Sequence, residues 1–148
     1  MPNRDPEIPV RKGGLLNCTK IYFEDRGEGE PLLLLHGFSG SSQDWVRSLE
    51  SWGGGLRFLI PDLRGHGRPG ILSEPFRHAD AAADILALLD RLGIENIRGA
   101  GVSGGGNVLL HMAARQPERM RALVLLSATR YFPAQARAIM RAYAASIS

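Results

Sequence analysis

Residues 97–106, IRGAGVSGGG, decide the fold, because a short apolar segment runs there into a serine set among glycines. Over residues 101–105 the stretch matches the pattern Gly-x-Ser-x-Gly of a nucleophile elbow, a serine on a sharp turn from a strand into a helix. Over residues 99–104 it also matches the dinucleotide-binding pattern Gly-x-Gly-x-x-Gly, in which glycines let a pyrophosphate approach the helix. Both patterns need a strand, a turn and a helix, so the stretch alone does not choose between them.

Two features outside this stretch favour the elbow. A dinucleotide site uses an acid about 20 residues further on, at the end of the next strand, to bind the ribose. Glu118 has roughly that spacing, but it precedes the apolar run at residues 122–126 that predicts the next strand. The dinucleotide pattern also usually lies on the first strand of its domain, whereas strand-like and helix-like segments alternate here from residue 32 onward. A dinucleotide-binding domain is therefore the least favoured interpretation.

Apolar runs and helical spacing predict the fold class. Four short runs are typical of strands buried in a parallel sheet: residues 32–35, 57–60, 97–102 and 122–126. Apolar residues recur at helical spacing over residues 78–92, and a second helix is expected after Ser103 as far as Arg115. Helices of this length allow right-handed crossovers between parallel strands. We therefore expect an α/β fold, with a mainly parallel sheet and crossover helices.

The remaining segments predict smaller elements. The first ten residues are expected to lack regular structure, residues 15–24 to form a pair of strands, and residues 25–29 to form a turn. The two serines at residues 41–42 can cap a short helix, and Pro133 can open a last one.

The composition excludes several classes of protein. A length of 148 residues fits one domain, and 44% apolar with 22% charged residues argues against a disordered, collagen-like or membrane-spanning chain. The single cysteine, Cys18, excludes an intrachain disulfide. Residues 1–10 contain no apolar signal region, so we expect a cytoplasmic protein with no membrane partner.

The net charge of +3 is unevenly distributed along the chain. Residues 111–148 contain six arginines and a single acid, Glu118. These arginines lack the interleaved aromatic residues of a nucleic-acid stacking surface. We therefore expect a solvated helix face and no nucleic-acid partner.

Four motifs follow one another along the chain: LLLLHGF at residues 32–38, PDLRGHG at 61–67, GVSGG at 101–105 and QPER at 116–119. In this order and spacing they resemble the amino-terminal half of an α/β-hydrolase of the esterase, lipase and C–C hydrolase type, over about residues 20–130. The resemblance implies a lead-in at residues 1–14, followed by the amino-terminal half of a hydrolase core at residues 15–130. Residues 131–148 would begin a cap or lid helix.

The same resemblance implies the site residues and the chemistry. Ser103 is expected to be the nucleophile that forms an acyl-enzyme, and the backbone N–H groups of Phe38 and Gly104 are expected to form the oxyanion hole. The implied substrate is a small-molecule ester or a related acyl or C–C bond, with no cofactor and no metal. Relatives with an aspartate nucleophile, such as epoxide hydrolases and dehalogenases, fit less well because serine occupies the elbow. Four further residues are expected to support the site: His36, Gly37, Gly101 and Gly105.

Simpler roles compete for these polar residues. Ser103 could act only as a helix N-cap, where serine is a favoured residue, but the flanking glycines and the upstream motifs favour the nucleophile. His66 lies in a predicted loop, where its simplest role is to fix a turn. His78 lies near a predicted helix start and is most simply a surface residue.

The chain lacks a catalytic acid and histidine in the expected order. In this fold an acid and then a histidine follow the nucleophile, but only His111 and then Glu118 follow Ser103. His111 lies eight residues along the predicted helix, about 12 Å down its axis, so it does not fit as the general base. Without a base, the serine hydroxyl stays protonated and is a weak nucleophile.

We therefore expect the 148-residue chain to be an inactive, truncated portion of a longer hydrolase, incomplete at its carboxyl end. The apolar strand at residues 122–126 would then be an unprotected sheet edge. The alternative is a non-catalytic binding module or pseudo-enzyme.

Overall fold

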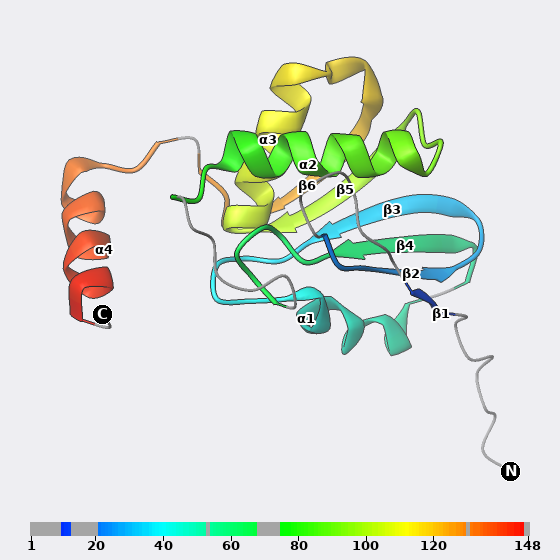
Figure 1. The fold of residues 1–148 in the computed structure, drawn as a ribbon, viewed down its shortest axis with the longest axis horizontal. Coiled ribbons are helices and arrows are strands. Elements are labelled where there is room, and N and C mark those ends of the chain that lie inside the picture. Colours follow the sequence, from blue (N-terminus) through cyan, green and yellow to red (C-terminus); the bar gives the residue numbers. More distant parts are fainter. Residues whose placement is uncertain (1–9, 13–20, 53, 68–74, 130, 147–148) are drawn as a thin grey trace, which may run out of the picture.

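The computed structural model describes residues 10–12, 21–52, 54–67, 75–129 and 131–146 (Figure 1). Cys18 and residues 15–20 of the predicted strand pair lie outside these ranges. The elements in chain order are β1 (Val10–Lys12), β2 (Phe23–Gly27), β3 (Glu30–Leu35), α1 (Ser42–Val46), η1 (Leu49–Ser51), β4 (Leu56–Pro61), α2 (His78–Arg91), β5 (Ile97–Val102), α3 (Gly104–Arg115), η2 (Pro117–Arg119), β6 (Met120–Leu126) and α4 (Ala134–Ser146), where η marks a 3-10 turn.

The strands of the described residues form one six-stranded sheet in the order β1-β2-β4-β3-β5-β6. β3 pairs in parallel with β4 and β5, and β5 pairs in parallel with β6, whereas β2 runs antiparallel to β1 and β4. The four strands predicted from apolar runs correspond to β3, β4, β5 and β6, so the α/β class with a mainly parallel sheet is confirmed. Because β3, β4 and β5 are parallel neighbours, their carboxyl ends meet at one edge of the sheet.

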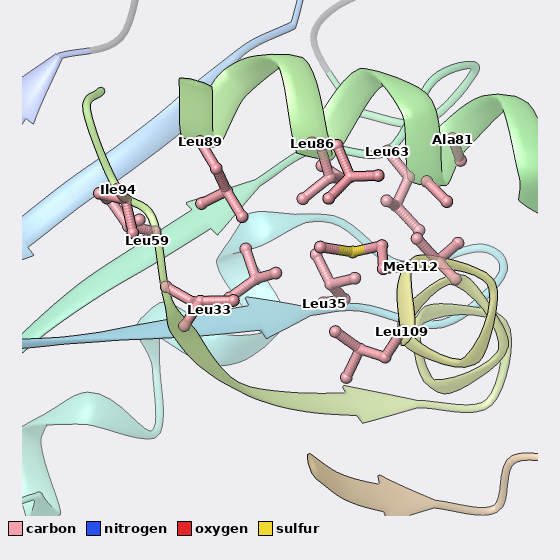
Figure 2. Close-up of a cluster of buried hydrophobic side chains, with 14 residues drawn as sticks. Leu33, Leu35, Leu59, Leu63, Ala81, Leu86, Leu89, Ile94, Leu109 and Met112 are labelled. Atoms are coloured by element: carbon pink, nitrogen blue, oxygen red, sulfur yellow. The ribbon is translucent and has the colours of Figure 1, made fainter. Parts of the chain in front are cut away.

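Helices cover both faces of the sheet, with α1 on one face and α2 and α3 on the other (Figure 1). Side chains of β3 alternate between these layers. Leu33 and Leu35 pack in the cluster that includes α2 and α3 (Figure 2), whereas Leu34 packs with Trp45 of α1. All three leucines are fully buried, as the prediction of a strand covered on both faces requires.

The structure corrects two predictions at the amino-terminal side of the sheet. β2 ends at Gly27, so the turn predicted at residues 25–29 is wrong for its first three residues. Asp25 of β2 accepts two hydrogen bonds from the guanidinium of Arg57 in β4, at 2.7 and 2.8 Å, and this contact stabilises a strand where the local sequence predicts a turn. β1 lies within the lead-in expected at residues 1–14, where it is ordered by pairing with β2.

β6 forms one edge of the sheet and is exposed over most of its length. Val124, Leu125 and Leu126 are 55%, 39% and 47% exposed. After Arg121 the strand has neither a charged residue nor a proline, the features that usually protect an edge from other chains. The predicted unprotected apolar edge is confirmed.

α4 begins after Pro133, as predicted, and stands apart from the sheet (Figure 1). Tyr131 before it and Ile139 on it are largely exposed. The role of this helix as the start of a cap or lid stays a prediction. Among the helices in the described part of the chain, none is both long enough and apolar enough to cross a bilayer.

Replacement of Val124 by lysine is expected to reduce self-association of the chain, because a charge on an exposed edge opposes strand pairing between molecules. Sedimentation velocity over a range of concentrations measures this as a smaller oligomer fraction. Ala87→Lys adds the same charge on the exposed surface of α2 and is the matched control, expected to behave like the wild type. Equal oligomer fractions for wild type and Val124→Lys would contradict a role for the edge in association.

Candidate active site

Ser103 occupies a strained turn between β5 and α3. Its φ of 50° and ψ of −113° lie outside the regions that a non-glycine residue normally adopts, at a cost of about 1–3 kcal/mol. The turn is held by its neighbours, because the Ser103 N–H donates to the carbonyl of Leu126 at 2.7 Å and its carbonyl accepts from Asn107 N–H at 3.0 Å. Ser103 occupies the N-cap position of α3, but its side chain makes no capping hydrogen bond with the described residues.

The glycines on either side of Ser103 allow the backbones to approach closely. A Cβ on Gly101 would lie 2.6 Å from the carbonyl carbon of Gly105. A Cβ on Gly105 would lie 2.5 Å from the carbonyl oxygens of Leu35 and His36 at the end of β3. These distances are below any normal contact, so the geometry requires glycine at both positions, as the elbow pattern predicts.

His36, directly after β3, ties together the ends of two strands. Its buried ring donates from Nδ1 to the Gly37 carbonyl at 2.8 Å and accepts the Leu63 N–H, after β4, at Nε2 at 3.0 Å. One nitrogen donates and the other accepts, so this arrangement requires the neutral ring. Burial lowers the pKa of His36 below its ordinary value of 6.5, against the opposing effect of the hydrogen bond to Gly37.

Residues 37–40 form a β-turn that lies against the elbow. The Gly40 N–H donates to the Gly37 carbonyl at 3.2 Å, and Ser39, third in the turn, has a φ of 65°, as in a type II turn. A Cβ on Gly37 would lie 3.5 Å from the Cβ of Ser103. Among the described residues, no acceptor is bound to the N–H of Phe38, the second residue of the turn.

Gly104, the second expected oxyanion donor, is the first residue of α3. The N–H groups of a first helical turn have no acceptor within the helix, and the helix dipole adds partial positive charge there. The ring of Phe38 lies over this residue, since two ring carbons would be 3.2 Å from a Cβ at Gly104. The loop after β3 and the start of α3 are therefore in contact, and this end of the sheet can stabilise negative charge.

Asp62, directly after β4, was not singled out from the sequence, although it is part of the motif at residues 61–67. It is buried and accepts the Ser42 N–H at 2.6 Å, so it connects the end of β4 to the start of α1. Gly67 packs so closely against the Asp62 carboxylate that no Cβ fits there. A carboxylate immediately after a buried strand was the signal that could have identified it.

Three rings from two other segments contact Phe38, and no sequence spacing predicted this cluster. The Phe38 ring centroid lies 5.1 Å from that of Phe76, 5.6 Å from that of His66 and 5.6 Å from that of His78. His111 of α3 stacks on His78 at 6.0 Å. His66 also donates from Nδ1 to the Arg64 carbonyl at 3.0 Å, in agreement with its predicted role in a turn.

The prediction that His78 is a surface residue is wrong. The residue is half-buried, and its Nε2 is inaccessible to solvent and has no hydrogen-bond partner among the residues that the structure describes. Burial is the main cause that lowers its pKa, and the stacked His111 ring lowers it further. The cause is tertiary, because α3 brings His111 against the start of α2.

Neither residue that could complete a triad is bound to Ser103. His111 is exposed and stacks on His78, and Glu118 lies in η2, before β6 begins. In the described part of the chain no hydrogen bond joins the Ser103 hydroxyl to a carboxylate or an imidazole, and no group of three or more potential metal ligands is present.

The chain matches known proteins over most of its length. A family model described as alpha/beta hydrolase fold matches residues 30–145. A non-heme haloperoxidase from Rhodococcus erythropolis is 34% identical over 112 residues, which are 74% of this chain and 41% of that protein. A haloalkane dehalogenase from Mesorhizobium japonicum is 30% identical over 126 residues, which are 85% of this chain and 39% of that protein.

Among solved structures, a thermophilic esterase from Thermogutta terrifontis superposes with a TM-score of 0.79 at 28% identity, and covers 94% of this chain and 53% of its own. The chain thus spans about half the length, or less, of these relatives. The three are named for different reactions, so likeness alone does not decide which reaction this chain serves.

Gly105→Ala is expected to lower the free energy of unfolding by about 2 kcal/mol or more. Alanine gains up to about 1 kcal/mol of helix propensity, but its Cβ would collide with backbone carbonyls that cannot move aside. Gly54→Ala is the matched control, because nothing lies within 4 Å of a Cβ there. Urea unfolding measures both, and equal stabilities would contradict the close packing at the elbow.

The lowered pKa of His36 predicts a loss of stability in acid. The folded protein binds the proton more weakly than the unfolded chain, so the stabilisation is present above about pH 6.5 and is lost as the pH falls through the lowered pKa. The urea midpoint should therefore fall between pH 7.5 and pH 5, and His36→Asn should show a smaller fall from a lower starting value. His78 contributes in the same direction, so some slope remains in the variant. An unchanged slope in His36→Asn would contradict the prediction.

Proposed function

Because the chain belongs to the α/β hydrolase fold family, we propose that it carries the nucleophile and the oxyanion-binding groups of a serine hydrolase that acts on small-molecule esters or related acyl or C–C bonds. The observation that carries the proposal is the strained conformation of Ser103 at the carboxyl end of β5, with a side chain that does not cap the helix. Strain of this kind persists only where the surrounding structure holds it, and it is often found at functional sites.

In the proposed reaction, the Ser103 Oγ adds to the substrate carbonyl, the alcohol leaves, and water then hydrolyses the acyl-enzyme. Negative charge develops on the carbonyl oxygen during the addition. The Phe38 N–H, left without an acceptor by the turn, and the Gly104 N–H at the start of α3 would stabilise that charge. Donors of this kind contribute about 3–4 kcal/mol each at comparable sites. No cofactor takes part in this scheme.

The hydroxyl proton of Ser103 must pass to a general base. His111 does not fit that role, because it is turned toward His78 and lies two helical turns from the elbow. All four histidines of the sequence, at residues 36, 66, 78 and 111, lie in the described part of the chain, and none is hydrogen-bonded to Ser103. The proposed reaction therefore needs a histidine oriented by an acid that a longer form of the protein would supply.

The second candidate is a binding module without catalysis of its own. It is favoured by one observation, the lack of any hydrogen bond between the Ser103 hydroxyl and a basic group in the described residues. In this case the 148-residue chain should hydrolyse p-nitrophenyl acetate no faster than its Ser103→Ala variant. Faster turnover by the chain, lost in Ser103→Ala, would contradict this candidate.

A fluorophosphonate probe tests the nucleophile directly. In an active form of the protein, one that includes the acid and the histidine, the probe is expected to label Ser103, and peptide mass spectrometry identifies the modified residue. Ser103→Ala should abolish labelling. Ser127→Ala is the matched control, because Ser127 also has a positive φ, of 54°, and follows the carbonyl that binds Ser103 N–H. An active enzyme that is not labelled at Ser103 would refute the proposal.

A further inference from the structure

Phe38 exposes much of a large apolar side chain beside the proposed nucleophile. It is 47% exposed, although its ring contacts Phe76, His66 and His78. A phenyl ring that is both exposed and held by neighbouring rings keeps its apolar surface in water at a cost in free energy. The exposed ring also lies against the first residue of α3, so it is a candidate contact for a molecule bound at Ser103.

The neighbouring rings fix the orientation of Phe38. Phe76 and His78 each meet it at an interplanar angle of 74°, in edge-type contacts, and His66 is tilted at 42°. Phe76 and His78 also contact each other at an interplanar angle of 87°, so the two rings that hold Phe38 support one another. The Phe38 ring therefore presents a constant surface rather than a freely rotating one.

The Phe38 ring lies beside the proposed nucleophile, Ser103. Two Phe38 ring carbons would lie 3.2 Å from a Cβ on Gly104, the residue that follows Ser103. The backbone of the same phenylalanine lies in the turn against the elbow, with Gly37 next to the Ser103 Cβ. A molecule whose carbonyl reaches Ser103 would therefore pass close to the Phe38 ring.

We infer that the Phe38 ring, held in place by the rings of His66, Phe76 and His78, forms one wall of the substrate site. This wall favours substrates with an aryl group next to the reacting carbonyl over saturated substrates of the same size. The inference rests on the proposed function for the position of that carbonyl. Aromatic rings pair in offset-stacked or edge-to-face arrangements that a saturated ring does not reproduce, which corresponds to about a 2- to 10-fold preference in affinity.

Binding of two stable amide analogues tests the wall without any need for turnover. The 148-residue chain is titrated with N-methylbenzamide and, separately, with N-methylcyclohexanecarboxamide, and backbone amide NMR signals are followed. The aryl compound is expected to shift the signals of Phe38 and Gly104 and to bind at least about 2-fold more tightly than the cyclohexyl compound.

Variants at Phe76 and His78 distinguish binding to the oriented Phe38 ring from general hydrophobic binding. Phe76→Leu and, independently, His78→Leu should reduce the aryl preference toward one, because the ring loses an edge contact. Tyr131→Leu removes an aromatic ring that is 64% exposed outside the cluster and should leave the preference unchanged. The amide spectra report whether each variant is folded. Because Phe76→Leu and His78→Leu are made independently, the test stays valid if one of them does not fold.

Equal affinity for the two amides, or shifts centred away from Phe38, would overturn the inference. Its failure is distinguishable from failure of the proposed function. An aryl preference in a protein that is never labelled at Ser103 would contradict the nucleophile alone, and labelling of Ser103 without an aryl preference would contradict the wall alone.

Discussion

The contact between the end of β3 and the first turn of α3 is the constraint on which the rest of the site depends. Gly105 lies so close to the carbonyls of Leu35 and His36 that no side chain fits between them. Helix α3 can therefore begin immediately after Ser103, and Ser103 takes the strained conformation that links β5 to it. The glycines thus make the geometry possible, and the neighbouring strands hold it in place.

This constraint gathers the ends of three parallel strands. His36 follows β3 and binds the backbone after β4, while the turn that contains Phe38 lies against Ser103 after β5. Each connection uses backbone groups or a buried neutral ring, so the arrangement is stiff and uncharged apart from Asp62, which is committed to the start of α1. A rigid site with unused N–H donors suits the stabilisation of charge that appears only during a reaction.

In contrast to the closely packed elbow, β6 and the described residues of α4 have mostly exposed side chains. β6 holds Ser103 through the Leu126 carbonyl, yet its outer edge and most of its side chains face solvent. The proposed oxyanion donors lie on elements that pack closely against one another, and no general base for Ser103 is present among the described residues. The chain spans about half the length, or less, of the relatives that it matches.

The sequence by itself determined the features that depend on short-range pattern. Glycine spacing around Ser103 predicted the elbow, and apolar runs predicted β3 to β6, because close backbone packing and burial on both faces restrict residue type at each position. Only the tertiary structure decided the rest. β2 extends to Gly27 because it pairs with β4, and His78 is half-buried, with His111 of α3 stacked on it. The rings that contact Phe38 come from two other segments, residue 66 and residues 76–78, and contacts between distant segments leave no periodic signal in a single sequence.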